Sequence, residues 1–365
     1  MSESVIVAGA RTPLSGLLAT LGAPSPAELG MVAIREALGR TGIDGGDVDR
    51  VVVGHGPTAD AGWGLTRRAA LRAGVAPDAA PPSADDVARA LGLGAIALAD
   101  ELVRSGKHRV VVAVGLEYLP ARPRTAVPPD GTQPPAALFP RDLVEFSGKE
   151  AYAALASRAG FGHGVGGPGR ARTGTALRGV SGPGGPVTPF ARSRPSAVPA
   201  PARPRMTGRV PNGASALIVM RKASARALGI DWLAEIAAYA TASPADGEPG
   251  ARPAAPSPVR ALTRALACAG VAPAGLALTE ADPTLPTQAR ASLRRLGGGP
   301  HPVGSPADGS TPGLPPGASG PRIALHLAQA LNRREGGLGG VVMCAPEGHG
   351  EALLIRAAPQ ERRAL

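Results

Sequence analysis

Cys344 is the residue whose type and position best suit covalent chemistry. It closes an apolar stretch expected to form a strand over 340–344, and the turn that follows, residues 345–350, contains His349. A thiolate is a strong nucleophile, and sites in α/β proteins gather at the carboxyl ends of strands. Cys344 is therefore a candidate catalytic residue, and a buried inert cysteine is the competing interpretation.

A second candidate is the glycine-rich segment Gly317–Gly320, which precedes a helix expected over residues 322–334. The first backbone N–H groups of a helix can bind an anion. Ser319 and Gly320 would then contact a substrate. A tight packing contact explains the glycines equally well, so both interpretations stay open.

Two further patterns do not indicate sites. Residues 162–167 match GxGxxG, but a helix is expected before them and Pro168 follows, whereas the dinucleotide motif needs a strand before it and a helix after it. We interpret this segment as a flexible linker. The histidines show no metal-ligand spacing with each other or with cysteine, and His326 is interpreted as a packed or surface residue of its helix. The histidines are His55, His108, His163, His301, His326 and His349.

Short apolar strands alternate with helices in two parts of the chain, which a central segment without this alternation separates. Strands are expected at 4–9, 51–54, 109–114, 340–344 and 351–356, and helices at 24–39, 65–73, 87–104 and 322–334. Such alternation predicts a parallel or mixed sheet covered on both faces. The similar segments 37–43 and 265–271 both lead from a helix into a strand, which indicates an internal duplication.

The segment between the halves, residues 120–204, is rich in Pro, Gly and Arg. One helix is expected in it, over Lys149–Ala159. Residues 162–205 have too few large apolar side chains to offset the entropy of ordering, so loops or disorder are expected there.

Composition excludes several classes of protein. Only two cysteines occur, Cys268 and Cys344, which excludes a disulfide scaffold and fits a reducing cytoplasm. The net charge of +11 comes from scattered arginines without interleaved aromatic residues, so no nucleic-acid partner is expected. No apolar run is long enough to span a bilayer, and no signal peptide is expected.

Several segments, in order along the chain, resemble motifs of the thiolase family. They match its N-terminal strand with an Arg-Thr-Pro turn, its nucleophile helix and the strand ending in Gly-Met-Glu, its Asn-Asp-Gly-Ala-Ala stretch, its Gly-His-Pro-x-Gly-Ala-Ser-Gly motif and its C-terminal Cys-x-Gly-Gly-Gly motif. The matching segments are 5–13, 94–100 with 110–117, 212–216, 317–322 and 344–350.

The resemblance implies a five-layer αβαβα fold of two similar halves and an acyl-CoA acyltransferase activity. Thiolases acylate one cysteine, which a histidine activates. A second cysteine moves the α-proton, and an Asn-Glu-Ala-Phe segment helps to bind the developing oxyanion. Cys344 corresponds to the acid–base cysteine. Ser319, Gly320 and Gly348 correspond to substrate-binding positions.

The chain departs from this pattern at the positions of the catalytic residues. The nucleophile position falls on Ala88 or Arg89, and no cysteine precedes Cys268. The activating histidine is replaced by Leu314. The Asn-Glu-Ala segment reads Thr279-Glu280-Ala281. The resemblance therefore predicts a thiolase-like protein without ordinary turnover, and two alternatives stay open: altered acyltransferase chemistry on Cys344, or a non-catalytic partner of an active thiolase-like subunit.

The same resemblance sets the expected organisation. Residues 1–119 with 207–223 form the N-terminal half, 120–206 a degenerate loop domain, and 224–365 the C-terminal half. A coenzyme A thioester is the expected substrate or ligand, and no metal or other cofactor is expected. The expected assembly is a homodimer or homotetramer, or a hetero-oligomer with an active subunit, in the cytoplasm and away from membranes.

Overall fold

The computed structural model describes residues 3–12, 25–55, 64–80, 92–117, 213–243, 256–282, 285, 287–296, 316–344 and 349–358. Three of the predicted site residues, Arg89, Leu314 and Gly348, lie outside the described residues. So do the helix expected over 149–159 and the loops expected over 162–205.

Within the described residues, each half contributes four strands and three main helices. The first half holds β1 (Ser4–Arg11), α1 (Pro26–Gly39), β2 (Arg50–His55), α2 (Leu65–Arg72), α4 (Gly94–Arg104), β3 (Val110–Glu117), β4 (Gly213–Arg221) and the short α7 (Lys222–Ala227). The second half holds β5 (Ala234–Ala242), α8 (Ser257–Ala269), β6 (Leu276–Ala281), α9 (Thr287–Arg295), α10 (Pro316–Arg333), β7 (Gly337–Cys344) and β8 (Gly350–Ala357).

The strand order confirms the internal duplication. The eight strands are hydrogen-bonded in the order β2-β3-β4-β1-β5-β8-β7-β6, so each half repeats the same arrangement. In both halves the outer pair is parallel (β2 with β3, β6 with β7) and the remaining pairs are antiparallel. Within the sheet, the two halves meet where β1 pairs with β5, at Val5 with Glu235 and Ile6 with Ala234.

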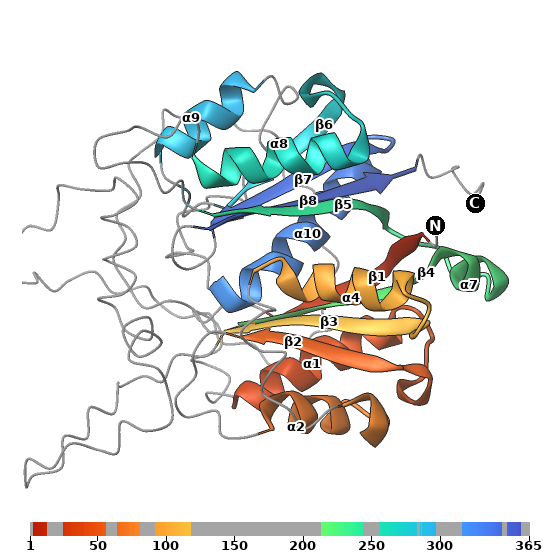
Figure 1. The fold of residues 1–365 in the computed structure, drawn as a ribbon. Helices are drawn as coiled ribbons and strands as arrows, with labels where there is room; N and C mark the ends of the chain where they lie inside the picture. The colour runs from red at the N-terminus through yellow and green to blue at the C-terminus, as the bar shows by residue number, and fades with distance from the viewer. Residues whose placement is uncertain are drawn as a thin grey trace, which may run out of the picture.

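The two half-sheets lie on either side of a central pair of helices (Figure 1). Helices α4 and α10 lie between the half-sheets, α1 and α2 cover the outer face of the first, and α8 and α9 cover the outer face of the second. Three clusters of buried side chains fill the spaces between these five layers. The expected αβαβα fold is thus the observed one. None of the described helices is long and apolar enough to cross a membrane.

Local sequence explains α1, while packing sets the start of α10. Ser25 and Glu28 form the capping box that the pattern around residue 25 allows, and α1 begins at Pro26. Helix α10 begins at Pro316, earlier than the predicted start at residue 322, even though it contains glycines and Pro321. Tertiary contacts of those glycines offset their low helix propensity.

Candidate functional site

The N-termini of the two central helices meet at one point. Gly320 of α10 packs directly on the backbone of Gly92, just before α4, so that a Cβ at residue 320 would collide with it. Gly92 has a φ of +63°, a conformation that glycine adopts readily. A Cβ at Gly115 of β3 would likewise collide with the backbone of Gly317. Of the two interpretations of Gly317–Gly320, the described structure shows the tight packing contact.

A buried carboxylate from the first half caps the helix of the second. Glu117, at the end of β3, is 3% exposed, and its Oε2 accepts a hydrogen bond of 2.9 Å from the backbone N–H of Gly317. Burial raises the pKa of Glu117 to about 7, against the opposing effect of that hydrogen bond. The Gly317 N–H is therefore occupied by the chain's own side chain.

A second carboxylate makes the reciprocal contact. Glu351, at the start of β8, accepts a hydrogen bond of 2.9 Å at Oε2 from the N–H of Leu93, the residue before α4. Its Oε1 accepts another of 3.1 Å from the hydroxyl of Tyr239 on β5. The pKa of Glu351 is raised because burial outweighs the opposing effect of these two hydrogen bonds. Each half thus supplies a carboxylate to the central helix of the other half.

Cys344 lies at the end of β7, but its thiol faces the outer layer. Successive side chains of a strand point to opposite faces. Met343 belongs to the central cluster, whereas Cys344 packs against the cluster between the second half-sheet and α8 and α9. The pKa of Cys344 is raised to about 11, first by burial and then by the negative charges of Asp282 and Glu351.

The Thr279–Glu280 segment forms a buried pair with a histidine. Glu280 on β6 is fully buried, and its Oε2 lies 2.9 Å from Nδ1 of His326 on α10. Burial raises the pKa of Glu280, and His326 opposes that effect. Glu280 Oε1 and Thr279 Oγ1 have no hydrogen-bond partner among the described residues. From the sequence, His326 was interpreted as a packed or surface residue of its helix. The pair with Glu280 was not predicted, because only the fold brings β6 beside α10.

The described structure does not bring the predicted site residues into one cluster. Cys344 faces the outer layer, Glu280 lies against α10, and Ser319 and Gly320 are buried at the junction of the central helices. Glu117, Glu351 and Tyr239, which the sequence did not single out, are the polar side chains at or near that junction. In the described part no group of three or more His, Cys, Asp or Glu side chains could hold a metal ion.

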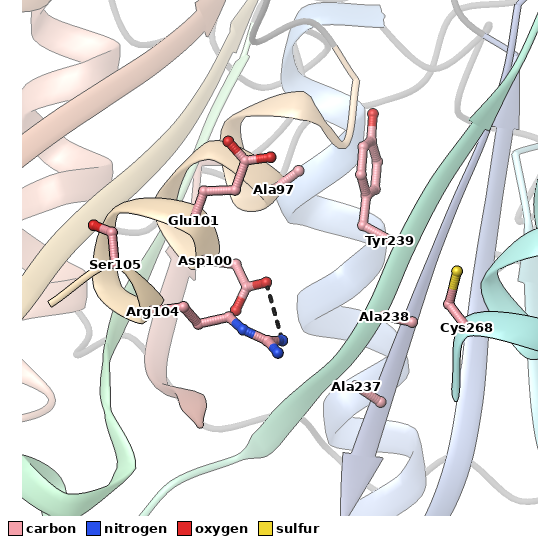
Figure 2. A pocket seen from close by; sticks show the side chains of 9 residues that line it. All are labelled: Ala97, Asp100, Glu101, Arg104, Ser105, Ala237, Ala238, Tyr239 and Cys268. Carbon is pink, nitrogen blue, oxygen red and sulfur yellow. Dashed lines mark ion pairs between the residues drawn. The ribbon is translucent and has the colours of Figure 1, made fainter. Parts of the chain in front are cut away.

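A cavity of about 550 Å³ opens along α4, away from its N-terminus (Figure 2). Arg104 pairs with Asp100 across 3.7 Å, and Ser4 also donates a hydrogen bond to Asp100. Tyr239 belongs to both regions, because its ring lines the cavity while its hydroxyl reaches Glu351. The lining residues are Ala97, Asp100, Glu101, Arg104, Ser105, Ala237, Ala238, Tyr239 and Cys268.

The duplicated five-layer fold, with two central helices that meet at their N-termini, has a close counterpart among solved structures. Human mitochondrial 3-ketoacyl-CoA thiolase superimposes with a TM-score of 0.64 at 18% identity, covering 98% of this chain and 99% of that one. The fold therefore defines a thiolase-like α/β protein.

Sequence comparison gives the family. Residues 4–133 match the N-terminal domain of thiolase, and residues 230–357 match its C-terminal domain. A probable acetyl-CoA acetyltransferase of Mycobacterium tuberculosis is 31% identical, with 98% of this chain and 100% of the relative covered. An acetyl-CoA acetyltransferase of Pseudomonas aeruginosa is also 31% identical, with 97% and 99% covered. The chain belongs to the thiolase family.

Proposed function

We propose that this thiolase-family protein binds a coenzyme A thioester without forming an acyl-enzyme, and that it acts as a non-catalytic partner of an active thiolase-like subunit or as an acyl-CoA binder. One observation carries the proposal. The backbone N–H of Leu93 at the start of α4 is occupied by the carboxylate of Glu351. A backbone N–H at a helix N-terminus stabilises developing negative charge only when it is open to the substrate, so this N–H is not available for that role.

The residue types support the same proposal. The nucleophile position reads Arg89 or Ala88, and the histidine position reads Leu314. Neither Arg89 nor Ala88 can attack a thioester, and Leu314 cannot activate a thiol. Loss of a nucleophile that acts as a unit with its base removes on the order of 10⁶ in rate.

The alternative, acyl transfer on Cys344, has weaker support. Its thiol packs toward α8 and α9, and its pKa is raised to about 11. Only a small fraction of Cys344 is therefore in the thiolate form at neutral pH, and the thiolate is the nucleophilic form of cysteine. A role for Cys344 in proton transfer is compatible with this state.

The proposal also covers the ligand, the domain organisation, the oligomeric state and the cellular location. Relatives named as acetyl-CoA acetyltransferases and a neighbour named as a 3-ketoacyl-CoA thiolase support a coenzyme A thioester as ligand. We propose an N-terminal half at 1–119 with 207–223, a loop domain at 120–206 and a C-terminal half at 224–365. We further propose that the protein forms a homo-oligomer, or a hetero-oligomer with an active subunit, and that it is located in the cytoplasm.

Two measurements on the purified full-length protein test it. Thiolysis of acetoacetyl-CoA should be absent, and turnover in the usual range of roughly 1–10³ per second would overturn the non-catalytic role. Acetyl-CoA should raise the unfolding free energy by about 2.7 kcal/mol at a hundred times its Kd. An unchanged melting temperature at millimolar acetyl-CoA would remove the binding role.

A further inference from the structure

The cavity along α4 lies where the two halves of the chain meet. One face of α4 lines it from the first half, through side chains spaced by three and four residues, and β5 and the end of α8 line it from the second half. Ligand sites are common at such junctions, and about 550 Å³ is the size of a small-molecule site. The walls are a helix and a strand, which hold side chains more precisely than loops do.

Short side chains on both sides leave the cavity open. Ala97 of α4 and Ala237 and Ala238 of β5 line it, and a methyl group does not reach across. Ala97 and Ala238 are themselves buried at 7% and 8% exposure, so they belong to the packed wall of the cavity. The cavity therefore offers apolar surface for a short alkyl chain.

The charged side chains of the cavity leave one carboxylate without a counter-ion. Arg104 lies 3.7 Å from Asp100, which also accepts a hydrogen bond from Ser4, so the guanidinium offsets the charge of Asp100. Glu101 is exposed, and its carboxylate has no ion pair or hydrogen bond within the described part of the chain. The lining thus carries one excess negative charge, which disfavours a phosphorylated ligand such as coenzyme A and favours a cation.

The Tyr239 ring supplies a second group that attracts cations. Its hydroxyl donates a hydrogen bond of 3.1 Å to Glu351, and donation to a carboxylate makes the ring richer in electrons. The face of such a ring attracts an ammonium group. In Figure 2 the Glu101 carboxylate and the Tyr239 ring lie at one end of the cavity, and Asp100 and Arg104 lie at the other. The charge of Glu101 also contributes, after burial and Glu351, to the raised pKa of Tyr239.

We infer that the end of the cavity between Glu101 and Tyr239 binds a small organic cation, an alkylammonium group whose carbon chain lies against the alanines. The carboxylate and the ring contact the charged head, and Arg104 excludes the site's use by a second cation at the other end. This site goes beyond the proposed function, because the coenzyme A thioester is an anion and would not occupy it.

Calorimetric titration of the full-length chain with choline tests the inference. A monocation held by one exposed ion pair and one ring contact should bind with a Kd of about 1–10 mM. Two control compounds isolate the charge: 3,3-dimethylbutan-1-ol has the shape of choline without its charge, and butyrate is an anion. At equal ionic strength neither should bind.

Cys268 reports where the cation binds, because its exposed thiol lines the same cavity. Choline should slow the iodoacetamide alkylation of Cys268, followed by peptide mass spectrometry at pH 7, with the concentration dependence given by calorimetry. Cys344, which does not line the cavity, is the internal control, and its alkylation rate should not change.

Four variants separate the two contacts. Glu101→Gln keeps the size of the side chain and should raise the Kd about fivefold by removing the charge. Tyr239→Leu should raise the Kd about threefold, whereas Tyr239→Phe keeps the ring and should stay within about twofold of the parent. Glu36→Gln, which removes an exposed carboxylate of α1, is the matched control and should leave the Kd unchanged.

Absence of choline binding up to about 100 mM would overturn the inference. Equal binding of the uncharged alcohol, or binding that leaves Cys268 unprotected, would do the same. So would an unchanged Kd in both Glu101→Gln and Tyr239→Leu with native circular dichroism, or an equal change in Glu36→Gln. None of these results depends on whether acetyl-CoA binds, so they are distinct from a failure of the proposed function.

Discussion

Replacing Glu117 with Gln should stabilise the protein at alkaline pH and much less at acidic pH. The side chain is almost completely buried, and its pKa is about 7 in the folded protein against an ordinary value of 4.5. A carboxyl whose folded pKa is raised binds more protons in the folded state, so its contribution to stability falls as pH rises from about 4.5 to about 7. Linkage gives a cost of about 1 kcal/mol at pH 5 and about 3 kcal/mol at pH 8.

Gln keeps a carbonyl oxygen that can accept the hydrogen bond from Gly317. Any cost of burying its amide group is independent of pH, so that cost cancels between two pH values. Urea unfolding of parent and Glu117→Gln at pH 5 and pH 8 measures the difference. The variant should gain about 2 kcal/mol relative to the parent between the two conditions.

The control for this experiment is Glu36→Gln. Glu36 is exposed on α1 and pairs with Arg40 across 3.0 Å. Surface pairs of this kind contribute at most about 1 kcal/mol, so the variant should show little pH-dependent gain. Equal stability differences for Glu117→Gln at both pH values would refute the conclusion that burial, rather than the capping hydrogen bond, dominates at Glu117.

Three further substitutions test the packing account by chemical denaturation. Gly320→Ala should destabilise the fold by about 1–3 kcal/mol or more, because its methyl group meets the Gly92 backbone; wild-type stability would show that the two helix N-termini do not touch. Ser25→Ala should lose about 1 kcal/mol by removing the capping box of α1, and Ser25→Thr should retain most of it. His326→Ala should lose about 3 kcal/mol by leaving Glu280 buried without its partner. Adding Glu280→Gln to His326→Ala should recover stability, and a further loss would contradict the pairing.

Local patterns predicted the strands β1, β2, β3, β7 and β8, because each is encoded over a few residues, whereas β4 and β5 were not predicted. Apolar runs marked the strands near residues 5, 52, 112 and 342, and the helix expected over residues 24–39 is α1. The repeated segments predicted an internal duplication, and the strand order agrees with it. The early start of α10 was missed, because Gly317, Gly320 and Pro321 are poor helix formers whose contacts come from distant backbone.

The site was harder to predict because its interactions join distant parts of the chain. Glu117 meets Gly317 across 200 positions, and Glu351 meets Leu93 across 258. No spacing rule connects such residues. The side on which the Cys344 thiol lies depends on the alternation along β7, and because β7 is buried on both faces its apolar sequence does not distinguish them.

The central claim is that no side chain of this protein becomes acylated by a thioester. Intact-mass spectrometry of the purified chain, after incubation with acetoacetyl-CoA and rapid acid quenching, tests it most directly, with an active thiolase treated in parallel as a positive control. The mass of the chain should stay unchanged while the control gains one acetyl group. A stoichiometric gain of one acetyl group on this chain, mapped to any residue, would contradict the account.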